Sequence, residues 1–265
     1  MIYREKNKKR VKITLLYAGL LTVLYVLTLP CSVPRVFGQD AEEIIRKVDQ
    51  KMRGDYSYQE LEMKIVRPEW ERAISMKSWS KGSEYALILI TAPAKEKGQV
   101  FLKRGTEMWN WLPSIERMIK IPPSMMMQSW MGSDFTNDDL VRESSIIKDY
   151  EHHLIGEVQY DEVTCWKIEL IPKEEAPVVW GRILTWIDKD YNQRKVEYYD
   201  EDGNLVNTMY LSDIREMGDR KMPTHWEMIP ADEEGKKTVI NVLEADFNNP
   251  IPESFFSQQN MRLVR

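Results

Sequence analysis

Alternation of apolar and polar residues with a period of two dominates the chain and predicts an antiparallel β protein. Within 59–67, Leu61, Met63 and Ile65 alternate with charged residues, whereas 84–93 is almost continuously apolar, as in a buried central strand. Short acidic turns separate the runs, which favours a meander over βαβ units. The other strand-like runs are 72–80, 98–105, 106–113, 164–171, 182–188, 194–199, 205–214, 224–229 and 238–247.

One segment near the start of this region has the helical period instead. In residues 40–52, Ile44, Ile45, Val48 and Met52 fall on one face of a helix. Asp40 is a favourable N-cap, and Gly54 ends the predicted helix.

Residues 121–142, "IPPSMMMQSWMGSDFTNDDLVR", have neither period. They predict a short helix over 125–130 with Ser124 as its N-cap, followed by a second short helical turn that ends near Leu140. An apolar helical insert in a sheet protein is either a mobile lid over a cavity or a plug that fills one end of a half-barrel. The sequence does not distinguish the two.

The first 38 residues have the pattern of a signal peptide. A basic stretch precedes the apolar run Ile13–Leu29, and the expected cleavage lies between Gly38 and Gln39. Export to the periplasm follows from this reading. The alternative is an uncleaved segment that anchors the protein in the inner membrane, since the run is barely long enough to span a bilayer. Cys31 lacks the preceding residues of a lipidation site.

Residues 39–265 then form one domain with 30 basic and 41 acidic residues, a net charge near −11. This charge argues against nucleic acid as a partner. All nine Trp and fourteen of the fifteen Met lie in this part. Such a surplus indicates either an aromatic core or a surface adapted to an apolar ligand.

Candidate chemistry is sparse. Asp134, Asp138 and Asp139 stand close together, but caps and first-turn charges of a short helix explain them without catalysis. His152 and His153 alternate faces if they lie on a strand, so at most one points at a given site. No phosphate loop, nucleophile elbow or zinc motif is present in the sequence. We therefore expect no catalytic residues, no cofactor and no metal.

The block "TAPAKEKGQVFLKRGTEMWNWLPSIERMIKIP", followed by "MGSDFTNDDL", resembles the LolA-like family of periplasmic outer-membrane lipoprotein-sorting proteins. The sequence departs from the family at "PPSMMMQSW", where members usually have a Ser- and Arg-rich stretch. The positions that carry the resemblance are Pro93, Gly98, Leu102, Trp109, Leu112, Pro113, Arg117, Met131 to Thr136, Asp139 and Leu140.

The resemblance implies a mostly β fold: a strongly curved antiparallel sheet, or incomplete β-barrel, with an N-terminal helix and a helical lid. It also implies a carrier that moves lipoprotein acyl chains or another lipophile between an inner-membrane transporter and an outer-membrane acceptor. The expected cargo-binding residues are Leu87, Leu89, Trp109, Trp111, Leu112, Met125, Met126, Met127, Trp130, Met131 and Phe135. Those expected to shape or hold the lid are Gly98, Pro113, Arg117, Gly132, Ser133, Asp134, Thr136 and Asp139.

Two other functions stay open. One is a non-enzymatic accessory or interaction protein of an inner-membrane exporter, with a filled core. The other is an envelope lipid hydrolase that uses one of the three aspartates with His152 or His153. A monomer is expected in each case.

Overall fold

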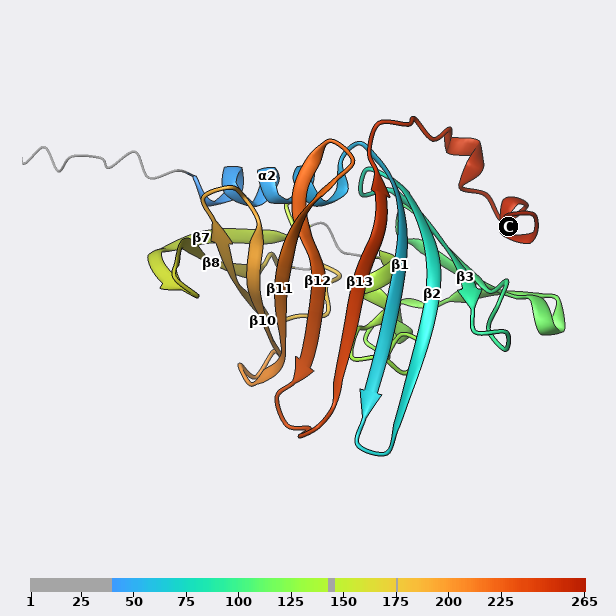
Figure 1. Cartoon of the computed structure of the whole chain (residues 1–265), viewed down its shortest axis with the longest axis horizontal. Coiled ribbons are helices and arrows are strands. Elements are labelled where there is room, and N and C mark those ends of the chain that lie inside the picture. The colour runs from blue at the N-terminus through green and yellow to red at the C-terminus, as the bar shows by residue number, and fades with distance from the viewer. Residues whose placement is uncertain (1–39, 143–145, 175) are drawn as a thin grey trace, which may run out of the picture. The chain divides into compact units, whose positions relative to one another are not determined.

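The computed structural model describes residues 40–142, 146–174 and 176–265. The expected signal peptide and its cleavage site lie outside these residues. The described chain forms one 13-stranded sheet in the order β6-β5-β4-β3-β2-β1-β13-β12-β11-β10-β9-β8-β7 (Figure 1). Every neighbouring pair is antiparallel. The predicted mostly β, antiparallel fold is therefore confirmed.

The helix predicted over 40–52 and the eleven predicted strands are present, with bounds that differ by a few residues. Two further strands, at 117–121 and 150–160, were not among the predicted runs. The helix is α2 (Ala41–Arg53). The strands are β1 (Tyr56–Arg67), β2 (Trp70–Lys81), β3 (Tyr85–Ala92), β4 (Val100–Arg104), β5 (Glu107–Leu112), β6 (Arg117–Ile121), β7 (Tyr150–Tyr160), β8 (Val163–Pro172), β9 (Arg182–Asp188), β10 (Gln193–Tyr199), β11 (Leu205–Met217), β12 (Arg220–Pro230) and β13 (Lys237–Asp246).

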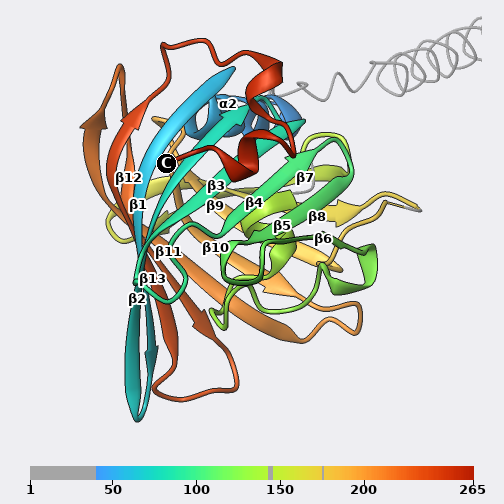
Figure 2. The ribbon, with the colours of Figure 1, turned by 90° about the vertical axis from the view of Figure 1, so that its right-hand side faces the viewer.

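The sheet is strongly curved. Figure 2 shows β3–β5 and β8–β10 extending on the same side of the central strands β1, β2 and β13. Helix α2 lies across one end of the strands (Figure 1). Asp40 caps it by accepting the N–H of Glu42 at 3.2 Å, and Ile44, Ile45 and Val48 are buried in the core of the concave face.

Both faces of the sheet carry an apolar core. Along β3, Ile88 and Ile90 point to the concave face, whereas Leu87 and Leu89 point to the outer face. The chain after β13 covers that outer core, with Phe256 and Met261 fully buried in it. This explains the continuous apolar run of the strand, because each face packs against its own cover.

The strand order fixes the path of the segment between β6 and β7. These two strands are consecutive in the chain but form the two opposite edges of the sheet. The connection between them therefore spans the distance between the edges, and its described parts, residues 122–142 and 146–149, pack on the concave side. Trp130 and Phe135 are buried in the concave core, and the Trp130 and Phe101 rings lie 5.2 Å apart.

The predicted helix over 125–130 is wrong. Only a 3-10 turn, Pro123–Met125, forms there, followed by a reversal that pairs Ser129 with Thr136. The Trp130 N–H donates to the Phe135 carbonyl at 2.8 Å, which a helix through Trp130 would not allow. The second turn does form, as a π-helical turn at Asp138–Arg142.

Candidate functional site

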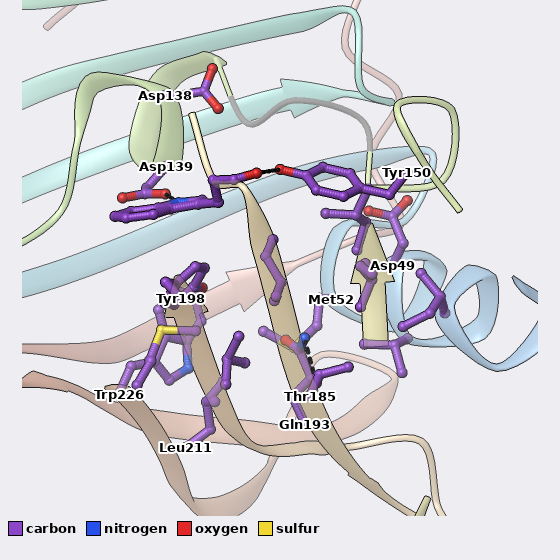
Figure 3. A pocket seen from close by; sticks show the side chains of 18 of the residues that line it. Asp49, Met52, Asp138, Asp139, Tyr150, Thr185, Gln193, Tyr198, Leu211 and Trp226 are labelled. Atoms are coloured by element: carbon purple, nitrogen blue, oxygen red, sulfur yellow. Dashed lines mark hydrogen bonds between the residues drawn. The ribbon is translucent and has the colours of Figure 1, made fainter. Parts of the chain in front are cut away.

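The concave face contains a cavity of about 160 Å³ between α2, the 135–140 stretch and strands β7–β12. Figure 3 shows side chains from these elements converging on it, with Asp49 and Met52 on α2 and Tyr198, Leu211 and Trp226 on the sheet. Most of its lining is apolar: Ile45, Val48, Met52, Phe135, Leu140, Leu170, Ile183, Val196, Met209 and Leu211. A mainly apolar hollow with few polar groups is the usual form of a small-molecule binding site.

Aromatic side chains line one part of this cavity. Trp180, in the chain just before β9, lies with its ring 5.1 Å from that of Tyr198 on β10. The Tyr150 hydroxyl donates to the Trp180 carbonyl at 3.5 Å. Through Trp180, these contacts join strands β7 and β10 at the cavity.

Asp139 brings a carboxylate to the same place. Its Oδ2 accepts the Thr136 N–H at 2.8 Å, while the Thr136 hydroxyl accepts the Asp139 N–H at 3.1 Å. This reciprocal pair is a capping box that starts the π-helical turn. Its Oδ1 accepts the indole N–H of Trp180 at 3.0 Å. Burial raises the pKa of Asp139 to about 6, although these hydrogen bonds lower it.

Asp134 has a different role from the predicted cap. Its carboxylate pairs with the Arg67 guanidinium at 2.9 Å and accepts the Thr238 hydroxyl at 2.6 Å. Arg67 also donates to the Gly132 carbonyl at 3.0 Å, and Arg72 donates to the Met131 carbonyl. The sheet therefore holds the Met131–Thr136 motif through β1, β2 and β13.

The expected cargo-binding residues do not meet in one place. Phe135 lines the cavity, and Met126 and Trp130 are buried beside it in the concave core. Met127 is largely exposed, whereas Met125 exposes 37% of its surface. Met131 is half-buried and packs against the concave core.

The remaining expected cargo residues lie on the other face. Leu87, Leu89 and Trp109 are buried in the outer core beneath the C-terminal residues, and Trp111 packs against it. Trp109 and Trp111 do share a face, as their spacing predicts. Leu112 is half-buried at the end of β5.

Among the residues expected to shape the lid, Ser133 and Thr136 are buried with the motif. The Ser133 hydroxyl donates to the Trp130 carbonyl at 2.7 Å and tightens the reversal, where Gly132 has a φ of 82°. Gly98 has a φ of 84°, and a Cβ there would meet the Pro113 ring at 3.5 Å. Arg117 is exposed at the start of β6. The cations that contact the Met131–Thr136 motif are Arg67 and Arg72 instead.

Several cavity residues were not predicted as functional, above all Trp180, Tyr198 and Trp226. The signal in the sequence was the apolar face that alternation gives to each of the strands β9–β12. It could not single these residues out, because the same pattern also describes an ordinary core.

The described residues offer little support for a catalytic or metal-binding site. His152 Nε2 contacts the Ile146 carbonyl at 2.7 Å, and His153 is exposed beside Glu151. Neither lines the apolar cavity. Within residues 40–142, 146–174 and 176–265, no group of three or more His, Cys, Asp or Glu side chains is placed to hold a metal ion.

A curved, open antiparallel sheet with a helix at one end and an apolar cavity on its concave face defines a LolA-like fold. A family model described only as "Uncharacterized protein" matches residues 82–263, more than half of the chain. The chain belongs to that family. Among curated proteins no match is found.

Solved structures agree with this assignment. A DUF1329 family protein from Desulfovibrio piger has a TM-score of 0.76 and 26% identity, covering 83% of this chain and 97% of its own. A LolA superfamily protein from Nitrosomonas europaea has a TM-score of 0.74 and 22% identity, covering 84% and 100%. A domain assigned to outer-membrane lipoprotein sorting, from Vibrio parahaemolyticus, has a TM-score of 0.72 and 22% identity, covering 84% and 98%.

In the part of the chain that the structure describes, helices are too short or too polar to cross a bilayer.

Proposed function

We propose that this protein is a non-enzymatic carrier that holds an apolar chain, such as a lipoprotein acyl chain, in the cavity on its concave face. The observation that carries the proposal is the apolar cavity between α2, the 135–140 stretch and strands β7–β12. Each methylene group removed from water there gains about 0.8 kcal/mol. The LolA-like fold and the lipoprotein-sorting assignment of the Vibrio parahaemolyticus domain support the same class of cargo.

The size of the cavity bears on how cargo enters. An engineered apolar cavity of roughly 150 Å³ takes up benzene, so about 160 Å³ holds only a short part of an acyl chain. Loading a longer chain therefore requires α2 or the Asp138–Arg142 turn to move away from the sheet. The Asp139–Trp180 hydrogen bond is one contact that such opening breaks.

The setting that we propose is the periplasm, reached through the N-terminal signal peptide. In that setting the protein, as a monomer, takes cargo from an inner-membrane transporter and delivers it to an outer-membrane acceptor. Release requires a partner, since an acyl chain does not return to water unaided.

The direct test is extraction of the purified protein and mass spectrometry of the lipids it retains. Val196 is buried on β10 and lines the cavity, so Val196→Phe fills it. We expect this variant to retain at least about tenfold less lipid. Leu243→Phe is the matched control, because Leu243 is exposed on β13. Wild-type protein that binds no acyl compound would contradict the proposal.

A second candidate, an accessory protein of an exporter, is favoured by one observation. Ile115, Ile119 and Met125, at and next to edge strand β6, expose 56%, 44% and 37% of their surface. Exposed apolar side chains along a sheet edge can pair with another protein. Ile119→Lys should then abolish copurification with a membrane partner while lipid retention is unchanged.

A further inference from the structure

Part of the family motif builds a groove on the outer face of the sheet, which shares no lining residue with the apolar cavity. The turn after β3 is closed by two backbone hydrogen bonds. The Lys97 N–H donates to the Pro93 carbonyl at 3.0 Å, and the Gly98 N–H donates to the Ile90 carbonyl at 2.9 Å. Gly98 lies beside the ring of Pro113 and forms one wall of the groove with it. These motif residues therefore shape the outer face and not the proposed cargo site.

The groove is much larger than the apolar cavity. Its volume is about 840 Å³, within the range of clefts that take up drug-sized ligands. Leu89 and Ile90 form an apolar floor and are 3% and 0% exposed. Trp111 and Val264 are half-buried in its lining. We call this hollow the outer groove and define it by Leu89, Lys97, Trp111, Pro113, Glu116 and Arg262.

Positive charge predominates among the side chains of the outer groove. Lys97, Arg262 and Arg265 are cations, and Glu116 is the one acidic side chain in its lining. Within the described part of the chain, none of these four side chains takes part in an ion pair. The groove thus has the opposite sign to the protein as a whole, since residues 39–265 carry a net charge near −11.

An aromatic ring orients one of these cations. The Arg262 guanidinium lies 5.2 Å from the centroid of the Trp111 ring, and such stacking leaves its N–H donors available to a carboxylate. Arg104, on the same face, shows the complete arrangement. Its guanidinium lies 5.7 Å from the Tyr85 ring and also pairs with Glu253 at 3.3 Å. Arg262 has the ring, but no described residue supplies its carboxylate.

The shape of the outer groove favours an extended chain over a membrane as its occupant. A flat bilayer surface does not reach a buried floor, and the net negative charge of the protein opposes approach to anionic headgroups. An extended chain presents alternate side chains to opposite sides, so apolar ones can enter the groove while acidic ones meet the cations. Ile115 and Leu263, each next to lining residues in the chain, expose 56% and 61% of their surface and extend the apolar contact area.

We propose that the outer groove binds an extended, acidic segment of another protein. Carboxylates of this segment pair with Lys97 and Arg262, and its apolar side chains contact Trp111 and the floor. Because the outer groove and the apolar cavity lie on opposite faces of the sheet, the protein holds cargo and partner at the same time. The inference goes beyond the carrier function and does not depend on it.

The test selects binders without assuming their sequence. Wild-type protein is used to select from a random library of displayed heptapeptides. The enriched peptide is then synthesised together with a version in which Asn and Gln replace Asp and Glu. We expect enrichment of acidic and apolar residues, and at least about tenfold tighter binding of the acidic peptide by fluorescence anisotropy. This difference should shrink at high salt, because salt screens exposed charges.

Charge-reversing variants locate the peptide. We expect Lys97→Glu and Arg262→Glu each to weaken binding of the acidic peptide at least about tenfold, since like charges then face each other. Lys221→Glu is the matched control, because Lys221 is exposed on β12 and outside the outer groove. Lys97→Arg keeps the charge and should keep the affinity, which guards against a folding defect. Lipid retention should be the same in all four variants.

The inference is overturned if no peptide is enriched, if the enriched peptides lack acidic residues, or if Lys97→Glu and Arg262→Glu bind the acidic peptide as tightly as the wild type. Two other occupants are tested with the same variants. Cosedimentation with phosphatidylglycerol vesicles that both variants lose would assign the groove to a membrane instead. Self-association in analytical ultracentrifugation that both variants lose would assign it to a second copy. Peptide binding by a protein that retains no lipid would contradict the carrier function alone.

Discussion

Asp139 joins three parts of the molecule through one carboxylate. It caps the π-helical turn through Thr136, accepts the indole N–H of Trp180, and lines the apolar cavity of the concave face. Because burial disfavours its charged form, protonation of this group costs less free energy than in an unfolded chain. The residue therefore couples the pH of the surroundings to the contact between the connecting segment and the sheet.

A pH dependence of stability follows. The pKa of Asp139 is about 6 in the folded protein, above the ordinary aspartate value of 3.8. The stability that protonation provides is complete below the unfolded pKa and is lost as the pH rises through the folded pKa. Between about pH 7 and about pH 5, the wild type should gain about 1 kcal/mol relative to Asp139→Asn. Urea denaturation of both proteins at the two pH values measures this difference, and parallel pH profiles would refute it.

Asp134 is held by an ion pair that is mostly shielded from water, with 12% of the Arg67 side chain and 6% of the Asp134 side chain exposed. Asp134→Ala leaves the guanidinium buried without its anion, so we expect a loss of about 3 kcal/mol in the free energy of unfolding. Glu107→Ala is the control, because its pair with Lys120 is exposed and should cost less than about 1 kcal/mol. An unchanged stability together with lost hydrolytic turnover would instead favour the hydrolase function.

At the scale of elements, the C-terminal residues after β13 and the segment between β6 and β7 cover opposite faces of the sheet. The first buries Phe256 against Leu87 and Leu102 in the outer core. The second buries Trp130 and Phe135 in the concave core. The Trp-rich strand β5 contributes its tryptophans to the outer core, and thus to stability and not to the cavity.

This separation predicts different effects for two buried phenylalanines. Phe256→Ala should lower the free energy of unfolding by about 3 to 5 kcal/mol and leave the affinity of the folded protein for dodecanol unchanged. Phe135→Ala should lower stability by a similar amount and also change that affinity at least about threefold, since Phe135 lines the cavity. Denaturation and calorimetry below the melting temperature of each variant test both expectations. A weakened affinity in Phe256→Ala would show that the two cores are not independent.

At the scale of the whole molecule, the open sheet separates a stable part from one that has to move. Strands β1, β2 and β13 pair along most of their length in the middle of the sheet. Helix α2 and the Asp138–Arg142 turn, in contrast, cover the cavity from the open side. Local opening concentrates where few backbone hydrogen bonds join an element to the rest of the fold.

Ligand binding should therefore protect these covering elements selectively. With dodecanoate at saturation, we expect slower amide hydrogen exchange in α2 and in Asp138–Arg142, and little change in β1, β2 and β13. Mass spectrometry of peptic fragments measures this, with Val196→Phe as the non-binding control. Uniform protection across the sheet would point to global stabilisation without any opening of the cover.

Much of the fold could be predicted from the sequence because period-two alternation and turn residues act locally. The helix at Ala41–Arg53 and the strands in the central part of the sheet followed from that pattern. Strand β7 (Tyr150–Tyr160) did not, because it is an edge strand with mostly exposed side chains and so lacks a buried face. The connecting segment was misassigned over 125–130 because its conformation is set by the core into which Trp130 inserts.

The sequence by itself determined most of the secondary structure, the antiparallel class and the motif that carries the LolA-like resemblance. Only the tertiary structure decided which face of each strand is concave and what covers it. Leu87 and Ile88 are equally apolar neighbours, yet one lies under the C-terminal residues and the other on the concave face. Alternation separates two faces but cannot rank them, because that depends on the direction of sheet curvature and on distant segments. For the same reason, the alignment of Ser57, Ser80, Ala86 and Lys103 across β1 to β4 became visible only once the four strands were in register.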